Sequence, residues 1–512
     1  MKPAGTMNKP IHCFVAGLCG ILVFSAVYGQ EATGTAGTVR LGLSQTIATP
    51  ETPFWLHANR DGRIPLHSRR NTVLFGAYDR TFFQQSDFLD FEAGIRVDML
   101  ASDLDHQVRF SELYAHVRAA GGQVSIGRFH DIIGLNSGYL TTGSMLMSHN
   151  ALQPWKIRLS TDGYRSIPFT GERLSFKARW SEAILTDHRF VENVRVHQKN
   201  LYFRFQPVAR VTFTGGVVHN LMWGGRHPEL GRLHGSFSDW LKDVLIRPDT
   251  RVFHNVTPFG NGLGAYDMGV EFHYDRNMTV GVYRMFYIED KQSLDLRSPR
   301  DGMWTFFLDR RGDEKQRWIG FVTYEHVNTK KQDAGSHDAY GRAMYYSHNV
   351  YRDGWIHHGQ VLGTPFFMID TDKIGSKDRV LVNNIILAHH LGISGSLTRD
   401  LSYDLLISYS RNYGICNDQT SGGSCRGTVE SPVQQRADYI PFRELRRDRY
   451  SMMIRLRLPM DALIRSARAH SALHEAEPDR RFLGYISTAL DAGKYHEEAL
   501  FGFEIGLIMS LN

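Results

Sequence analysis

The chain has 512 residues, of which 42% are hydrophobic, 22% are charged and 12% are aromatic, with 48 glycines and 17 prolines. Such an aromatic content excludes an intrinsically disordered protein. The mean hydropathy of −0.31 excludes a bundle of transmembrane helices, each of which needs about 20 mostly apolar residues. Lys and Arg outnumber Asp and Glu by 59 to 53, but they form no stripe or tail, so no nucleic-acid partner is expected. The composition favours a large β-protein.

The first 29 residues have the pattern of a secretory signal peptide. Lys2 and Lys9 precede an uncharged, largely apolar stretch that ends in small residues, as in peptides that direct export. We expect cleavage near Gly29.

Two cysteines, Cys416 and Cys425, remain after this cleavage, in a polar and Gly-rich interval. Because an exported chain meets an oxidising compartment, a local disulfide between them is the first expectation. Two free thiols are the alternative, and a metal site is less favoured because no further ligand completes the set.

From about Asn71 onward, apolar and polar residues alternate in segments, many of which are about ten residues long. Such alternation gives a strand one apolar and one polar face. The clearest segments are 91–99, 174–180, 201–205, 268–274, 450–458 and 501–511.

A secreted β-sandwich would also alternate, but two features favour a membrane barrel. Many segments have the length of a tilted strand that crosses a bilayer, and their polar faces carry Arg, Lys, Glu and Asp. Aromatic clusters such as Trp304–Phe307 and Tyr345–Tyr346 are typical of interfacial girdles, with ordinary β-packing as the alternative. We therefore predict an all-β fold, a transmembrane antiparallel β-barrel of 16 to 18 strands.

Three parts depart from the strand pattern. Residues 30–70 are expected to form a small periplasmic or plug segment that leads into a barrel of residues 71–512. Residues 236–246 have a helical spacing of apolar residues after a cap-like Ser, so a short helix inside a loop is expected there. Long loops around 130–155, 224–262 and 328–380 are expected to be functional or to fold into the lumen.

Several motifs carry a family resemblance. The N-terminal one contains Pro53, Phe54, Trp55, His57 and Asn59. Others are Gly127–Arg128, Ser137–Pro154, Ile167–Thr170, Val218–Gly225 and Gly354–Gly363. In these motifs the chain resembles the Wzi-type capsule-assembly outer-membrane proteins.

The resemblance implies an 18-stranded barrel with a periplasmic helical element in the outer membrane of a Gram-negative bacterium. It also implies a non-enzymatic role in binding, attaching or organising capsular or other surface polysaccharide. The expected partners are that polysaccharide and outer-membrane lipid, with periplasmic export components left open. A porin-like diffusion channel for small solutes or sugars is the alternative.

Aromatic faces and Arg or His side chains are suited to bind acidic sugars. Residues of these types in the expected loops are the candidates for binding polysaccharide, although girdle packing or luminal ion pairs are the alternative for each. They are Trp223, Arg226, His227, Arg310, Arg311, Arg352, Trp355 and His357.

No catalytic or cofactor motif is found. Gly392-Ile-Ser394-Gly-Ser396 lacks the last glycine of a nucleophile elbow, and no His-Glu-x-x-His or phosphate-binding loop occurs. The adjacent pairs His357–His358 and His389–His390 would point to opposite faces of a strand and could not hold one ion. We therefore expect no enzyme activity, no cofactor and no metal site.

Overall fold

The computed structural model describes most of the chain beyond its N-terminal part. The described residues are 37–82, 89–131, 133–136, 138, 140–233, 260–289, 296, 298–310, 317–332, 344–415, 446–460 and 480–511. The predicted signal peptide, the predicted helix at 236–246 and both cysteines lie outside them.

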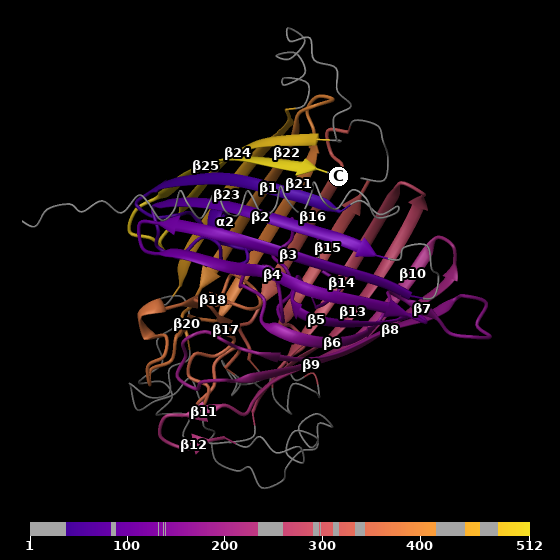
Figure 1. Cartoon of the computed structure of the whole chain (residues 1–512), viewed down its shortest axis with the longest axis horizontal. Helices are drawn as coiled ribbons and strands as arrows, with labels where there is room; N and C mark the ends of the chain where they lie inside the picture. The colour runs from indigo at the N-terminus through magenta and orange to yellow at the C-terminus, as the bar shows by residue number, and fades with distance from the viewer. Residues whose placement is uncertain are drawn as a thin grey trace, which may run out of the picture.

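The described chain forms one closed antiparallel β-barrel (Figure 1). The wall strands are β1 (Thr38–Thr49), β2 (Arg70–Phe82), β3 (Leu89–Ser102), β4 (His106–Ala119), β5 (Gly122–Arg128), β6 (Trp155–Thr161), β7 (Arg165–Ser166), β8 (Leu174–Ile184), β9 (Arg195–Val208), β10 (Val211–Trp223), β13 (Asn261–Asp275), β14 (Met278–Ile288), β15 (Gly302–Asp309), β16 (Phe321–Asn328), β21 (Ile386–Ser396), β22 (Ser402–Asn412), β23 (Arg447–Pro459), β24 (Arg480–Ala492) and β25 (Leu500–Leu511). The two-residue β7 pairs with β8 beyond the end of β6, so these 19 strands occupy 18 positions around the wall.

Neighbours in the wall are neighbours in sequence, and the barrel closes where β1 pairs with β25. That pairing runs from Val39 opposite Leu511 to Thr49 opposite Phe501. Closure removes the free sheet edges that a bilayer cannot accommodate. The barrel prediction is confirmed, and all six alternating segments lie within strands of the wall.

The predicted boundary at residue 71 is wrong, because residues 38–49 form the first wall strand. Strand β1 pairs with β2 on one side and with β25 on the other. Its alternation of apolar and polar residues is not regular enough to separate it, by sequence alone, from the segment that follows. Among the described residues of this segment, residues 50–69 lie between two wall strands and contain the four-residue helix α2 (Phe54–His57).

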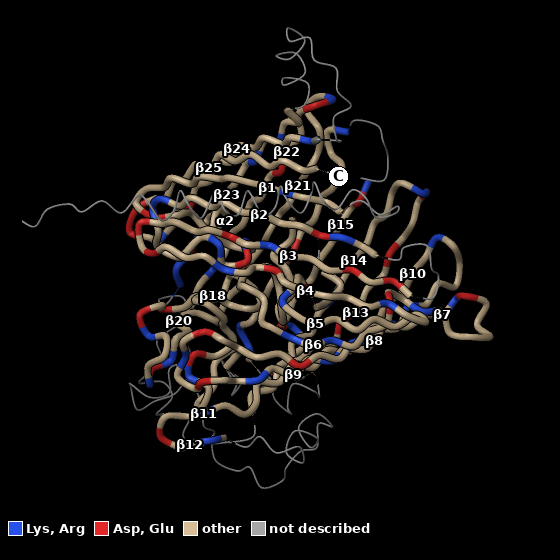
Figure 2. Tube along the Cα trace, in the orientation of Figure 1, with Lys and Arg blue, Asp and Glu red and all other residues tan. Residues whose placement is uncertain are grey.

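The two faces of each strand have different surroundings. On β9, Leu201, Phe203 and Phe205 are 37%, 45% and 46% exposed, whereas Tyr202 between them is 4% exposed. The exposed apolar side chains form a belt on the outside of the wall, as required by contact with lipid. Charged residues recur along β3, β4, β6 and β8 (Figure 2), and most of them face the lumen.

One cluster of luminal charges is centred on Asp131. Asp131 lies three residues after the end of β5. Its carboxylate accepts hydrogen bonds from Lys156 Nζ at 3.0 Å and from Arg158 Nη1 at 3.1 Å, and it also contacts Arg179. These cations hold the pKa of the Asp131 carboxyl below its usual range although burial opposes ionisation. Such clusters are stable in a barrel interior because each buried charge has a partner.

The connections differ greatly in length between the two ends of the barrel. Residues 50–69, 129–154, 224–260 and 329–385 all join strands at one end, which we call the loop end. The opposite end holds mostly shorter connections, such as 209–210 and 276–277, and one longer segment, 460–479. Figure 1 shows the short strands β11 (Arg226–His227), β12 (Gly231–Arg232), β17 (Ile356–His357), β18 (Gln360–Val361) and β20 (Leu381–Asn383) gathered at the loop end, whereas the C terminus lies away from them. The remaining short elements are β19 (Met368–Ile369) and a 3-10 turn at Thr371–Lys373.

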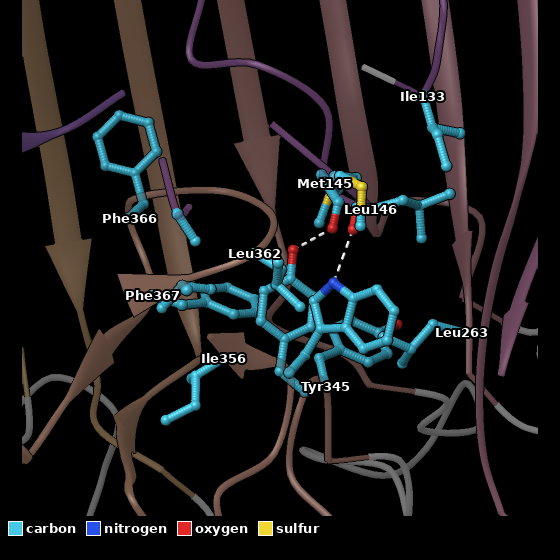
Figure 3. Close-up of a cluster of buried hydrophobic side chains, with 14 of the residues drawn as sticks. Ile133, Met145, Leu146, Leu263, Tyr345, Ile356, Leu362, Phe366 and Phe367 are labelled. Atoms are coloured by element: carbon cyan, nitrogen blue, oxygen red, sulfur yellow. Dashed lines mark hydrogen bonds between the residues drawn. The ribbon is translucent and has the colours of Figure 1, made fainter. Parts of the chain in front are cut away.

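The loops fold inward and form a hydrophobic core inside the barrel (Figure 3). We call the described parts of residues 50–69, 129–154 and 344–385 the plug. Its fully buried side chains include Tyr346 and Trp355, which pack with the inward-facing wall residues Leu263 and Met285. The expectation that these loops fold into the lumen is confirmed for 129–154 and 344–385.

The interpretation of Tyr345 and Tyr346 as members of an interfacial girdle is wrong. Both are 0% exposed in the plug core. Tyr345 packs its ring 4.3 Å from that of Tyr287, an inward-facing residue of β14.

Among the described residues, no helix has the length and apolar character needed to cross a membrane.

Candidate functional site

A hollow of about 490 Å³ lies at the loop end, between the β8–β9 connection and the loop that follows β10. It is lined by Ile184, Asn193, Arg195, Gly224, Gly225, Arg226, Gly231, Arg232 and Leu233. A neighbouring hollow of about 720 Å³ on the outer side of the wall shares Ile184 and Arg195 with it. Its other lining residues include Trp155, Trp223 and the exposed Ile126 and Ile157. We call the two together the rim site.

The backbone of the rim site depends on two glycines after β10. Gly224 and Gly225 have φ values of 63° and 93°, which favour glycine. A Cβ on Gly225 would lie 2.8 Å from the main-chain oxygen of Glu192. This close approach allows Arg226 N to donate to Glu192 O at 2.8 Å, and Glu192 N to donate to Arg226 O at 3.1 Å.

Strand pairing then brings the basic side chains together. In the small β11–β12 sheet, Arg226 is the register partner of Arg232. At the adjoining end of the wall, Arg195 of β9 is the register partner of Trp223 of β10. The Arg195 guanidinium lies 4.8 Å from the centroid of the Trp223 ring, a distance at which cation and ring attract each other.

The rim site has free hydrogen-bonding capacity. Arg195, Arg226 and Arg232 are exposed, and within the part of the chain that the structure describes none of them forms an ion pair. The indole Nε1 of Trp223 is buried and has no acceptor among the described residues. Guanidinium groups bind carboxylates with paired hydrogen bonds, whereas the buried indole N–H is not accessible to a ligand in this arrangement. The rim site is therefore suited to an anionic ligand that is rich in oxygen atoms.

Of the residues predicted from sequence, the structure brings Trp223 and Arg226 into this site. His227 is adjacent, but its ring is buried 4.9 Å from that of Phe190. Its Nδ1 accepts hydrogen bonds from the main-chain nitrogens of Glu229 and Leu230, so it shapes the turn between β11 and β12.

Two further candidates are inside the plug. Trp355 and His357 are both 0% exposed. Trp355 Nε1 donates to Leu146 O at 2.6 Å, and His357 Nδ1 lies 2.6 Å from Leu152 O. Burial and the nearby His358 hold the pKa of His357 well below its usual range. In this arrangement neither side chain is accessible to a ligand, and both join one plug loop to another.

The other candidates are dispersed. Arg352 is at the loop end, where its main chain bonds Val350 and Val380. Arg310 follows β15 at the turn end, where its N donates to Gly320 O at 2.7 Å, so it is remote from the rim site. Arg311 and the cysteines Cys416 and Cys425 lie outside the described residues.

The N-terminal motif is part of the plug. Pro53 precedes α2, Phe54 N donates to Asp491 Oδ2 of β24 at 2.9 Å, and Trp55 Nε1 donates to Ser408 Oγ of β22 at 3.1 Å. Burial lowers the pKa of His57 to about 3. Asn59 N donates to Asn150 Oδ1 at 3.1 Å. The motif thus joins α2 to the wall and to the 129–154 loop.

Sequence reasoning missed Arg195 and Arg232. Both are single basic residues at strand ends, and nothing in their neighbourhood along the chain marks them. Their signal is the strand register, which places Arg195 opposite Trp223 and Arg232 opposite Arg226.

Comparison with known proteins decides the family. The family model described as "Capsule assembly protein Wzi" matches residues 76–374, more than half of the chain. The chain belongs to the Wzi capsule-assembly family. No curated protein matches this Wzi-family chain in sequence.

A solved structure of the same family supports the fold. The structure of Wzi from Escherichia coli, described as an outer-membrane protein involved in group 1 capsule assembly and as a carbohydrate-binding β-barrel, matches with a TM-score of 0.51 at 13% identity. The match covers 99% of this chain and 89% of that one. OprD from Pseudomonas aeruginosa matches with a TM-score of 0.42 at 9% identity, over 94% of this chain and 97% of its own. This Wzi-family chain is accordingly an outer-membrane β-barrel of a Gram-negative bacterium.

Proposed function

We propose that this protein binds acidic capsular or other surface polysaccharide at its rim site and so attaches or organises that polysaccharide at the cell surface, without catalysis. The observation that carries the proposal is the group of three exposed arginines beside Trp223. Family membership supports it, as does the likeness in fold to the carbohydrate-binding Wzi of Escherichia coli.

The orientation of the barrel supports a role at the surface. Outer-membrane barrels have long extracellular loops and short periplasmic turns, so the loop end faces outward. Residues 50–69 then form part of a surface-side plug, which favours the plug over the periplasmic alternative expected from sequence. We retain three expectations within the proposal: export with cleavage near Gly29, contact of the apolar belt with outer-membrane lipid, and contact of the turn end with periplasmic export components.

The plug favours attachment over diffusion. A porin-like channel needs an open wet path along the axis, whereas here the described loops pack a hydrophobic core against the inner wall. We therefore expect low conductance in planar bilayers from the refolded protein. A large, steady and ohmic conductance would instead support the diffusion channel.

The direct test is binding of an acidic capsular polysaccharide to the detergent-solubilised full chain. Replacing Arg226 and Arg232 with alanine removes two guanidinium groups from the rim site. The matched control is Arg69→Ala with Arg70→Ala, which removes the same charge from exposed residues at the same end of the barrel. We expect affinity to fall about tenfold or more in the rim variant, since each charge-assisted hydrogen bond contributes about 1.5–3 kcal/mol.

The control variant should bind like the wild type. Equal losses in both variants would mean that only net charge matters and would overturn the assignment to the rim site. No binding by the wild type would overturn the proposed function.

A further inference from the structure

Three side chains with metal-ligating atoms converge where two plug segments meet. Asp61 belongs to the segment after α2, and His130 and His149 belong to the 129–154 loop. Asp61 Oδ1 is 3.4 Å from the Nδ1 atoms of both histidines, and these two nitrogens are 3.1 Å apart. The three atoms form a nearly equilateral triangle.

That triangle has the dimensions of one face of a metal tetrahedron. Zinc binds imidazole nitrogen and carboxylate oxygen at about 2.0–2.1 Å, so the ligand atoms of a tetrahedral site are about 3.3 Å apart. We propose that Asp61, His130 and His149 bind a divalent transition-metal ion such as Zn²⁺. Two imidazoles and one carboxylate are a donor set that Zn²⁺ accepts.

Hydrogen bonds around the triangle orient two of the ligands for this role. His130 Nε2 is 3.0 Å from Glu112 Oε1 of β4. If Nε2 carries the proton that Glu112 accepts, the lone pair of His130 Nδ1 faces the centre of the triangle, an arrangement common among metal-bound histidines. The other carboxylate oxygen of Asp61, Oδ2, is 3.0 Å from Arg63 Nη2, which leaves Oδ1 directed at the two imidazoles.

The backbone holds the carboxylate in place. Asp61 has a φ of 54°, a conformation that is uncommon for residues other than glycine but is tolerated by Asp and Asn. Asp61 N donates to His149 O at 2.6 Å, and Gly62 N donates to Asn150 O at 3.0 Å. The two segments are therefore paired at the point where their ligand atoms meet.

Partial exposure leaves room for a further ligand. The side chains of His130 and His149 are 38% and 34% exposed, whereas that of Asp61 is 10% exposed. Water can therefore complete the coordination, as in zinc sites with three protein ligands. The ion would join α2 and its following segment to the 129–154 loop, and so stabilise the plug. This proposal departs from the expectation of no metal site, which rested on residues close together in the sequence.

The test uses Co²⁺ and Zn²⁺ with the full chain in detergent, prepared without a polyhistidine tag. A Cys416→Ser and Cys425→Ser background prevents the thiols from taking the metal. We expect one Co²⁺ per chain with the intense visible absorption of a tetrahedral site, displaced by Zn²⁺, and a higher thermal unfolding temperature with Zn²⁺. We expect the parent protein to bind the metal ion and the double variant His130→Ala with His149→Ala not to bind it. That difference would locate the ion at these two histidines.

The matched control is His106→Ala with His188→Ala, which removes two exposed histidines elsewhere and should leave binding unchanged. Glu112→Gln should weaken Co²⁺ binding about tenfold while keeping the visible spectrum, because partners of metal-bound histidines contribute 10–100-fold to affinity. If the double histidine variant does not give the heat-modifiable gel migration of a folded barrel, Asp61→Asn replaces it. No stoichiometric binding by the parent, or unchanged binding in folded ligand variants, would overturn the proposal.

Discussion

The indole Nε1 of Trp355 donates a hydrogen bond of 2.6 Å to the main-chain oxygen of Leu146. The two residues are 209 positions apart, and both are 0% exposed. The bond joins the 344–385 part of the plug to the 129–154 part. It satisfies a carbonyl that would otherwise be buried without a donor, which is costly in an apolar interior.

Trp355→Phe retains a large aromatic ring but removes this donor. We expect the variant to lose about 1–3 kcal/mol of stability, the cost of an unsatisfied buried polar group, together with a packing term of the same sign. Denaturant unfolding in detergent measures the loss. The control is Trp318→Phe, because Trp318 is 73% exposed and its replacement should change little. Equal stability of both variants would contradict a structural role for Trp355.

A second contact joins the plug to the wall. Arg60 donates to both carboxylate oxygens of Glu504 on β25, at 3.1 and 2.9 Å. Arg60→Ala leaves the buried Glu504 with one cation, Arg455 at 3.5 Å, and with hydrogen bonds from the hydroxyls of Tyr485 and Ser487. Because breaking a buried ion pair typically costs 3–5 kcal/mol and Arg455 offsets part of this, we expect a loss of about 2 kcal/mol.

The functional consequence of Arg60→Ala should be visible in planar bilayers. If the loss of this ion pair loosens residues 50–69, the variant should show brief increases in conductance that the wild type lacks. Arg40→Ala is the control, since Arg40 pairs with Asp79 of β2 at 2.7 Å, away from the plug. If the Arg40 variant opens as often as the Arg60 variant, the plug contact is not what closes the barrel.

Asp301 predicts a pH dependence of plug stability. It lies just before β15 and accepts hydrogen bonds from Lys331 N, Gln332 N and the hydroxyl of Tyr345. Burial raises the pKa of its carboxyl to about 6 although these donors oppose the shift. The folded state therefore binds this proton more tightly than the unfolded state, in which an Asp has a pKa of about 3.9.

The stabilisation from Asp301 is fully present below about pH 4 and is lost as the pH rises through about 6. The expected loss is on the order of 3 kcal/mol, at 1.36 kcal/mol per unit of pKa difference. Unfolding free energies measured between pH 4 and 7 should fall with this slope in the wild type and less steeply in Asp301→Asn. An identical slope in both proteins would exclude Asp301 as the cause.

The wall could be predicted from sequence because alternation is a local property. A period-two pattern such as that of residues 201–205 indicates which face of a strand is apolar, and it does so without knowledge of the neighbouring strands. Strand β1 was missed because its pattern is less regular and merges with residues 50–69. The packing of the barrel interior was harder to predict, because loops are normally exposed and the sequence does not show which loop residues meet. In this wide barrel they fold inward and satisfy one another's main-chain groups, as Trp355 and Leu146 do.

The site residues illustrate the same limit. Trp223 and Arg226 could be proposed from residue type, but Arg195 and Arg232 join them only through strand register. Asp61 and His149 are 88 positions apart, and no spacing along the chain indicates that their ligand atoms meet. Such convergence is determined by the packing of two loops within the lumen.

The rim site should also be sensitive to a single added methyl group. Gly225→Ala places a Cβ 2.8 Å from Glu192 O at a φ of 93°, so we expect the pair of hydrogen bonds between Glu192 and Arg226 to shift and to displace Arg226. We expect polysaccharide binding to weaken several-fold while the barrel stays folded. Gly359→Ala is the control, because Gly359 lies outside the rim site and has a positive φ of 73° but no atom within 4 Å of its added Cβ. It therefore carries a backbone cost of about 1 kcal/mol without the clash. Equal binding by the two variants, measured with the same acidic polysaccharide, would show that the geometry around Arg226 does not control recognition.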